Sequence, residues 1–200
     1  MPKRSSRRRG YLPRKVNTRE IRKRFLIVCE GEKTEPNYFE GFRVPKIIIK
    51  VEGVGRNPSQ LVRKAAQLND NDDYDRVWCV FDKDDFLRED FNNAISGATS
   101  QGFSVAYSNK SFELWYLLHF EYVNTGISRA RYISKLSSWL GHKYEKNSGT
   151  MYGKLIDRQH IAIRNAKKLL DQYDSRCPPA NNDPSTTVHE LVEELNKSAK

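Results

Sequence analysis

Short apolar segments alternate with segments of helical periodicity over residues 24–121 of the chain. The apolar segments are 24–30, 46–51, 76–81 and 103–107, and charged or turn-forming residues flank them. Short runs that are apolar throughout are typical of strands buried on both faces of a parallel sheet. The pattern therefore predicts four strands with helices between them.

Capping residues indicate where the intervening helices begin. Thr34 and Asn57 are residue types that cap helix N-termini, and a proline follows each within two residues. Further helices are predicted over 85–99 and, with Ser111 as the candidate cap, over 112–120. Strands that alternate with helices predict an α/β fold, here a mainly parallel four-stranded sheet flanked by helices.

The remainder of the chain has a different pattern and is predicted to be helical. The expected helices are 128–140, about 154–173, and 186–198, and the loops between them contain Gly, Asn and Pro. We therefore expect an α/β core over 23–125 and a helical C-terminal region over 126–200 packed on it. Residues 1–22 are polar and carry many like charges, which predicts a disordered basic arm.

Composition narrows the class of protein. A length of 200 residues fits one domain, or one domain with an annex. No apolar run is long enough to span a membrane, and the basic N-terminus lacks the apolar segment of a secretory signal. Cys29, Cys79 and Cys177 do not have the paired spacing of a zinc site. We expect a reduced, cytoplasmic protein without a membrane anchor.

The net charge of +10 belongs entirely to residues 1–24, which are the N-terminal arm and the two residues after it. Residues 1–24 contain 11 Lys or Arg and one acid, whereas the rest of the chain contains 24 of each sign. Such an arm either binds the phosphates of a nucleic acid or is a solvated tail. The candidate nucleic-acid contacts are Arg7, Arg8, Arg9, Arg14, Lys15, Arg22 and Lys23.

Acidic residues follow two of the predicted strands. Glu30 ends the first strand, and Asp82, Asp84 and Asp85 follow the third. Functional groups in parallel α/β sheets gather beyond the carboxyl ends of the strands, so these carboxylates converge if the two strands are neighbours. Mg²⁺ (or Mn²⁺) would offset their repulsion and could activate water against a phosphodiester. Alternatively, Asp84 or Asp85 only caps the following helix.

Three further charged residues lie close to these acids in the predicted fold. Glu35 is a second-metal ligand or a helix-capping residue, and Lys33 neutralises charge on a reacting phosphate or is a surface cation. Glu113 either joins the acids or lies in the first turn of its own helix for capping. The pattern alone leaves each pair of alternatives open.

Two groups of basic residues in the C-terminal region are candidate nucleic-acid contacts. Arg129 and Arg131 adjoin Tyr132, a mixture that nucleic-acid surfaces use, and His160 and Arg164 are one helical turn apart. Both groups are also compatible with an ordinary helix surface.

Four segments of the chain resemble the motifs of the RloB-like family. They are Phe25–Phe39 (FLIVCEGEKTEPNYF), Val80–Phe86 (VFDKDDF), Ser108–Phe120 (SNKSFELWYLLHF) and Asn182–His189 (NDPSTTVH). The resemblance covers about residues 24–195. Lys110 is a departure, since proline is expected there in the family.

The segments also resemble the wider Toprim fold of topoisomerases, primases and some nucleases. In that fold a glutamate follows the first strand and an Asp-x-Asp pair follows the third, positions that correspond to Glu30 and to Asp82 and Asp84 here. The resemblance implies that these acids bind Mg²⁺ and that the glutamate also acts in acid–base catalysis.

The family resemblance also implies a biological role. RloB-like genes occur in restriction and abortive-infection loci, often beside a gene for an ABC-type ATPase. The resemblance therefore implies that this chain is a nuclease effector of anti-phage defence that cleaves RNA, such as tRNA, or DNA. The alternative is a non-catalytic subunit that binds nucleic acid or an ATPase partner. No phosphate-binding loop of an ATPase occurs in this chain, and the helical C-terminal region is a candidate homodimer interface.

Overall fold

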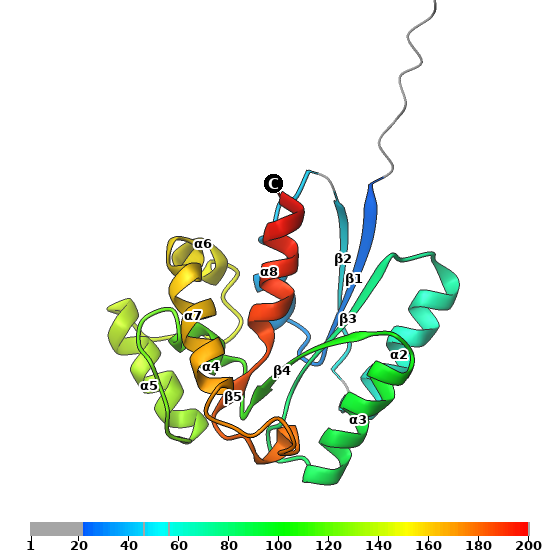
Figure 1. The fold of residues 1–200 in the computed structure, drawn as a ribbon. Coiled ribbons are helices and arrows are strands. Elements are labelled where there is room, and N and C mark those ends of the chain that lie inside the picture. The colour runs from blue at the N-terminus through cyan, green and yellow to red at the C-terminus, as the bar shows by residue number, and fades with distance from the viewer. Residues whose placement is uncertain (1–21, 46, 56, 200) are drawn as a thin grey trace, which may run out of the picture.

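The computed structural model describes residues 22–45, 47–55 and 57–199, and its centre is a mixed sheet (Figure 1). In this part of the chain the strand order is β2-β1-β3-β4-β5. The strands are β1 (Lys23–Cys29), β2 (Ile47–Gly53), β3 (Arg76–Asp82), β4 (Ser104–Asn109) and β5 (Ser185–Thr186). The first four are parallel, which confirms the predicted sheet, and β5 pairs antiparallel with β4.

Helices cover both faces of the sheet (Figure 1). They are α1 (Thr34–Phe39), α2 (Pro58–Asn71), α3 (Arg88–Ser100), α4 (Glu113–Leu117), α5 (Arg129–Leu140), α6 (Met151–Leu155), α7 (Gln159–Leu170) and α8 (Val188–Ala199). Helices α2 and α3 pack on one face. The other six share the hydrophobic core on the opposite side, where α5 packs on α4 and α6 packs on α1. The result is a three-layer α/β arrangement.

The central strand β1 shows why the predicted strands are apolar throughout. Phe25, Ile27 and Cys29 face the layer that contains α1 and α4, whereas Leu26 and Val28 face α2 and α3. All five side chains are buried. Because alternate side chains point to opposite faces and both faces are covered, no position from Phe25 to Cys29 is left for a polar residue.

The C-terminal region is tied into the sheet as well as packed on it. The short strand β5 is not predicted from the sequence, which places Ser185 in a loop and Thr186 in the expected helix 186–198. Thr186 instead pairs with Ser108 of β4. The Thr187 hydroxyl also accepts a hydrogen bond from the backbone N–H of Tyr107 at 2.9 Å. Residues more than 75 positions apart in the chain therefore fix the end of β4.

Several predicted helix ends are wrong. Lys33, not Thr34, is the N-cap residue of α1, and the Thr34 hydroxyl instead donates to the Lys146 carbonyl at 2.7 Å. Ser111 does not cap α4, which follows Phe112 without a side-chain cap. In contrast, Asn57 caps α2 as predicted, because its side chain accepts the N–H of Gln60 at 2.9 Å.

Two longer helix predictions also need correction. The helix expected over 154–173 is divided into α6, a short 3-10 turn at Ile156–Arg158, and α7. Helix α3 begins only at Arg88, and Leu87 precedes it with no side-chain cap. The alternative in which Asp84 or Asp85 caps this helix is therefore wrong.

The basic arm lies mostly outside the described residues. This applies to Arg7, Arg8, Arg9, Arg14 and Lys15, whereas Arg22 and Lys23 are described and exposed at the start of the sheet. Among the described helices, none is both long and apolar enough to cross a bilayer.

Candidate functional site

The predicted acids converge at the carboxyl ends of two neighbouring strands. Strands β1 and β3 pair directly, although β2 lies between them in the chain. The chain therefore turns to opposite sides of β1 at this point, and ligands of parallel α/β folds bind at such reversals. The Glu30 carboxylate accepts a hydrogen bond from the backbone N–H of Asp82 at 3.0 Å.

The end of β4 holds the acidic turn that follows β3. The backbone N–H of Lys83 donates to the Ser108 carbonyl at 2.8 Å, and that of Asp84 donates to the Lys110 carbonyl at 3.0 Å. Asp84 adopts a positive φ of 36°, which Asp tolerates better than most residues. These backbone bonds fix the positions from which the Asp82 and Asp84 side chains project.

Glu35 extends from α1 back over the end of β1. It is buried, and among the described residues its Oε2 atom has no hydrogen-bond partner. A Cβ atom on Gly31 would lie only 2.1 Å from that oxygen, so the carboxylate occupies the space that a side chain at position 31 would need. Glycine at this position therefore makes room for Glu35 beside Glu30.

Glu113 joins the acids from α4. It is 1% exposed, and the Tyr144 hydroxyl approaches its Oε1 atom at 3.5 Å. The residue before it, Phe112, donates its backbone N–H to the Asp82 carboxylate at 3.0 Å. The first turn of α4 thus places one carboxylate in the site and orients another.

Burial and mutual repulsion make these carboxyl groups hard to ionise. Burial, with smaller contributions from Glu35 and Asp84, raises the pKa of Glu30 to about 7. Burial, followed by Glu35, Glu30 and Glu113, raises the pKa of Asp82 well above its ordinary value. Burial and then Glu113 likewise raise the pKa of Glu35. A cation at this position would favour ionisation of all three groups.

Arg129 is a cation that the sequence did not assign to this site. One guanidinium nitrogen lies 3.1 Å from Asp84 Oδ2, and another lies 4.0 Å from Asp82 Oδ2. Burial alone lowers the pKa of Arg129, but Asp84, Glu113 and Asp82 outweigh it and raise that pKa. Neither a motif nor spacing indicated this contact, because α5 follows β3 by more than 45 residues.

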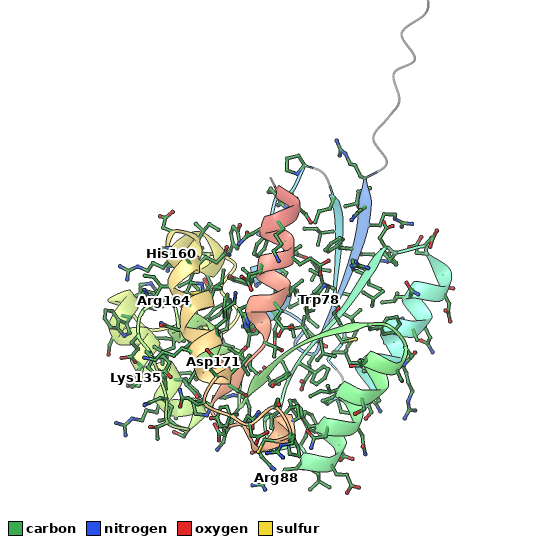
Figure 2. All side chains as sticks on the ribbon, in the orientation of Figure 1. Trp78, Arg88, Lys135, His160, Arg164 and Asp171 are labelled. Atoms are coloured by element: carbon green, nitrogen blue, oxygen red, sulfur yellow. The ribbon has the colours of Figure 1, made fainter. Side chains whose placement is uncertain are left out.

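Several other predicted residues are exposed, and Tyr132 is buried. Asp85 and Lys33 are exposed, and the Lys33 ammonium forms no ion pair with another described residue. His160 and Arg164 are exposed on α7 (Figure 2). Tyr132 is buried, so its ring is unavailable for stacking on a base beside Arg129 and Arg131.

The donor chemistry of the acid site suits a hard divalent cation. All of the converging side chains offer carboxylate oxygens, which Mg²⁺ and Mn²⁺ prefer, and the Glu35 Oε2 atom is buried without a partner. Across residues 22–45, 47–55 and 57–199, however, no three His, Cys, Asp or Glu side chains are already gathered closely enough to hold a metal. The carboxylates therefore need to move toward one another to bind one.

Comparison with known proteins gives one family and no individual relative. The family model described as RloB-like protein matches residues 25–195, which is most of the chain. No curated protein and no solved structure matches significantly.

Proposed function

Because this chain belongs to the RloB-like family, we propose that it is a Toprim-like, divalent-metal-dependent nuclease and an effector of bacterial anti-phage defence. Its substrate is RNA, such as tRNA, or DNA, and cleavage takes place in the cytoplasm. An ABC-type ATPase encoded nearby is the proposed partner, as the family resemblance implies. Any ATP hydrolysis would belong to that partner, since this sequence contains no phosphate-binding loop.

The observation that carries the proposal is the hydrogen bond between Glu30 and the backbone of Asp82. It joins the glutamate after the first strand to the Asp-x-Asp turn after the third, at the edge where α/β folds bind ligands. The same edge contains Glu35 and Glu113, both buried. Buried carboxylates at such density are unfavourable unless they serve a ligand or a reaction.

Glu30, Asp82 and Asp84 are the proposed metal ligands, with Glu35 and Glu113 as ligands of a second ion or as supports of the first. A bound Mg²⁺ or Mn²⁺ would polarise a phosphoryl oxygen and lower the pKa of a bound water. Glu30, whose pKa is about 7 without metal, can exchange a proton near neutral pH, which suits a general base or acid. Lys33 and Asp85 are exposed in the turns that follow β1 and β3. Lys33 is a candidate to neutralise charge on the reacting phosphate, and Asp85 is a candidate ligand of a second metal ion.

A cleavage assay with purified full-length protein tests this function. Labelled tRNA and labelled single- and double-stranded DNA are incubated with Mg²⁺, Mn²⁺ or EDTA, with and without the ATPase partner. We expect cleavage of one substrate class that needs metal and is lost in Glu30→Gln. Sequencing of RNA and DNA ends after induced expression, compared with Glu30→Gln, identifies the target in cells.

The same assay distinguishes the enzyme from a binding subunit. Metal-independent binding of nucleic acid, with no cleavage even when the partner is added, would show that the acids do not perform phosphodiester hydrolysis. The chain would then be an adaptor of the defence complex, and the metal, if bound, would be structural.

A further inference from the structure

Arg129 occupies a helical position that does not favour a cation. It is the first residue of α5, and Ser128 caps this helix by accepting the backbone N–H of Arg131 at 3.4 Å. The N-terminus of a helix carries partial positive charge, so an arginine in the first turn is mildly unfavourable there. The reason for a cation at this position therefore lies outside the helix, in the acids that it faces.

The Arg129 guanidinium is held mainly by its attraction to the carboxylates and only weakly by hydrogen bonds. Its contact with Asp84 at 3.1 Å is the close one, whereas Asp82 lies 4.0 Å away. Among the described residues, the Arg129 Nε atom is buried without a hydrogen-bond partner. The side chains of Arg129 and Asp84 are 36% and 37% exposed, so water reaches one side of the pair and weakens it.

One guanidinium cannot compensate the carboxyl groups around it. Five of them converge here, and Arg129 contacts two. The carboxyl groups are Glu30, Glu35, Asp82, Asp84 and Glu113. Glu35 keeps a buried oxygen atom without a partner even with the guanidinium in place. A compact ion of charge two, which approaches oxygen atoms to about 2.1 Å, would match this group better than a guanidinium does.

We propose that Arg129 is the built-in counter-ion of the metal-free acid site, and that a divalent cation displaces its guanidinium from Asp82 and Asp84. This inference rests on the metal site of the proposed function. The two cations compete because both need the same carboxylate oxygens. In the metal-free protein, Arg129 holds Asp82 and Asp84 near Glu30 but not in the arrangement of metal ligands. Displacement of the guanidinium frees both aspartates to move toward Glu30.

Metal-binding calorimetry on the full-length protein tests the competition directly. Mn²⁺ is titrated into wild type, Arg129→Gln and the matched control Arg131→Gln, which removes an exposed arginine from the same helical turn. We expect Arg129→Gln to bind Mn²⁺ about two- to fivefold more tightly than wild type does. This is the change in affinity that corresponds to the free energy of a half-exposed ion pair. Arg131→Gln should bind as wild type does. Without metal, Arg129→Gln should melt at a lower temperature than either.

A second measurement uses only the wild-type protein and so does not depend on a variant that folds. Phenylglyoxal modifies accessible arginines, and peptide mapping reports the rate at each position. Saturating Mn²⁺ should accelerate modification of Arg129 relative to Arg131. An unchanged ratio in the presence of bound Mn²⁺ would show that the guanidinium stays in place and would overturn the proposal.

The outcomes separate this inference from the proposed nuclease. If Mn²⁺ binds wild type and Arg129→Gln equally, the counter-ion role is wrong while the metal-dependent nuclease stands. If Arg129→Gln binds more tightly but no nucleic acid is cleaved under any condition, the counter-ion role stands and the nuclease is wrong. If Mn²⁺ binds neither protein, both are overturned.

Discussion

Glu30 Oε2 accepts the backbone N–H of Asp82 at 3.0 Å, and this hydrogen bond connects the ends of β1 and β3. The two residues are 52 positions apart in the chain, but their strands are direct neighbours in the sheet. The position of one acid is therefore coupled to the turn that carries the next two. A rigid sheet edge is a suitable support for groups that must meet a ligand with fixed geometry.

Glu30→Gln should abolish metal-dependent cleavage while the protein stays folded. The amide has the size of the carboxyl group, and its oxygen atom can still accept the N–H of Asp82. The charge and the exchangeable proton are lost, so we expect activity to fall by about 100-fold or more. Cleavage kinetics and circular dichroism check the two halves of this prediction. Glu89→Gln, which changes an exposed acid in the first turn of α3, is the control and should retain activity.

Gly31→Ala should disturb the site through Glu35. A Cβ atom at position 31 would lie 2.1 Å from Glu35 Oε2, far inside contact distance, so the Glu35 carboxylate must move. We expect a loss of stability of about 1–3 kcal/mol, as is usual for overpacking, together with weaker metal binding. Chemical denaturation and calorimetry with Mn²⁺ measure these two effects.

Gly153→Ala provides the matched control for that substitution. Gly153 lies within α6, and nothing is within 4 Å of the position that its Cβ would take. Alanine is favoured over glycine in a helix by about 0.5–1 kcal/mol, so this variant should be slightly more stable than wild type. If Gly31→Ala behaved in the same way, Glu35 would not be confined as the structure indicates.

The parts of the fold that depend on local sequence could be predicted, and the parts that depend on distant contacts could not. The four parallel strands and the acids at their ends follow from short apolar runs and the rule that such ends converge. Arg129 reaches Asp84 because α5 packs against α4, a contact between distant segments that no local pattern encodes. The same holds for Thr34, which the capping rules predicted to be the N-cap of α1. Its hydroxyl instead donates to the carbonyl of Lys146, which is distant in the sequence.

The pKa of Glu30 predicts how the stability of the metal-free protein changes with pH. Folding raises this pKa from 4.5 to about 7, so the folded protein holds the proton more tightly than the unfolded chain does. The stability from this group is therefore complete below about pH 4.5 and is lost as the pH rises through 7. The shift corresponds to about 3 kcal/mol.

Comparison with Glu30→Gln isolates this contribution from that of other groups. The free energy of unfolding is measured in EDTA from pH 5 to 8 for both proteins. Relative to the variant, wild type should lose stability as the pH rises, and added Mn²⁺ should reverse the loss because a cation favours the ionised carboxylate. Parallel pH profiles for the two proteins in EDTA would contradict the assignment of a raised pKa to Glu30.

Removal of residues 1–21 should weaken nucleic-acid binding without affecting the fold. This segment contains eight Lys or Arg and one acid, and the chain from residue 25 onward carries no net charge. If the arm binds phosphates, truncation lowers affinity and makes its dependence on salt shallower, by about 0.7–0.9 in log–log slope for each phosphate that the arm neutralises. Fluorescence anisotropy with labelled tRNA and DNA over a salt series measures both quantities. Equal slopes for the full-length and truncated proteins would identify the arm as a solvated tail, and recognition of the substrate would then belong to the folded body alone.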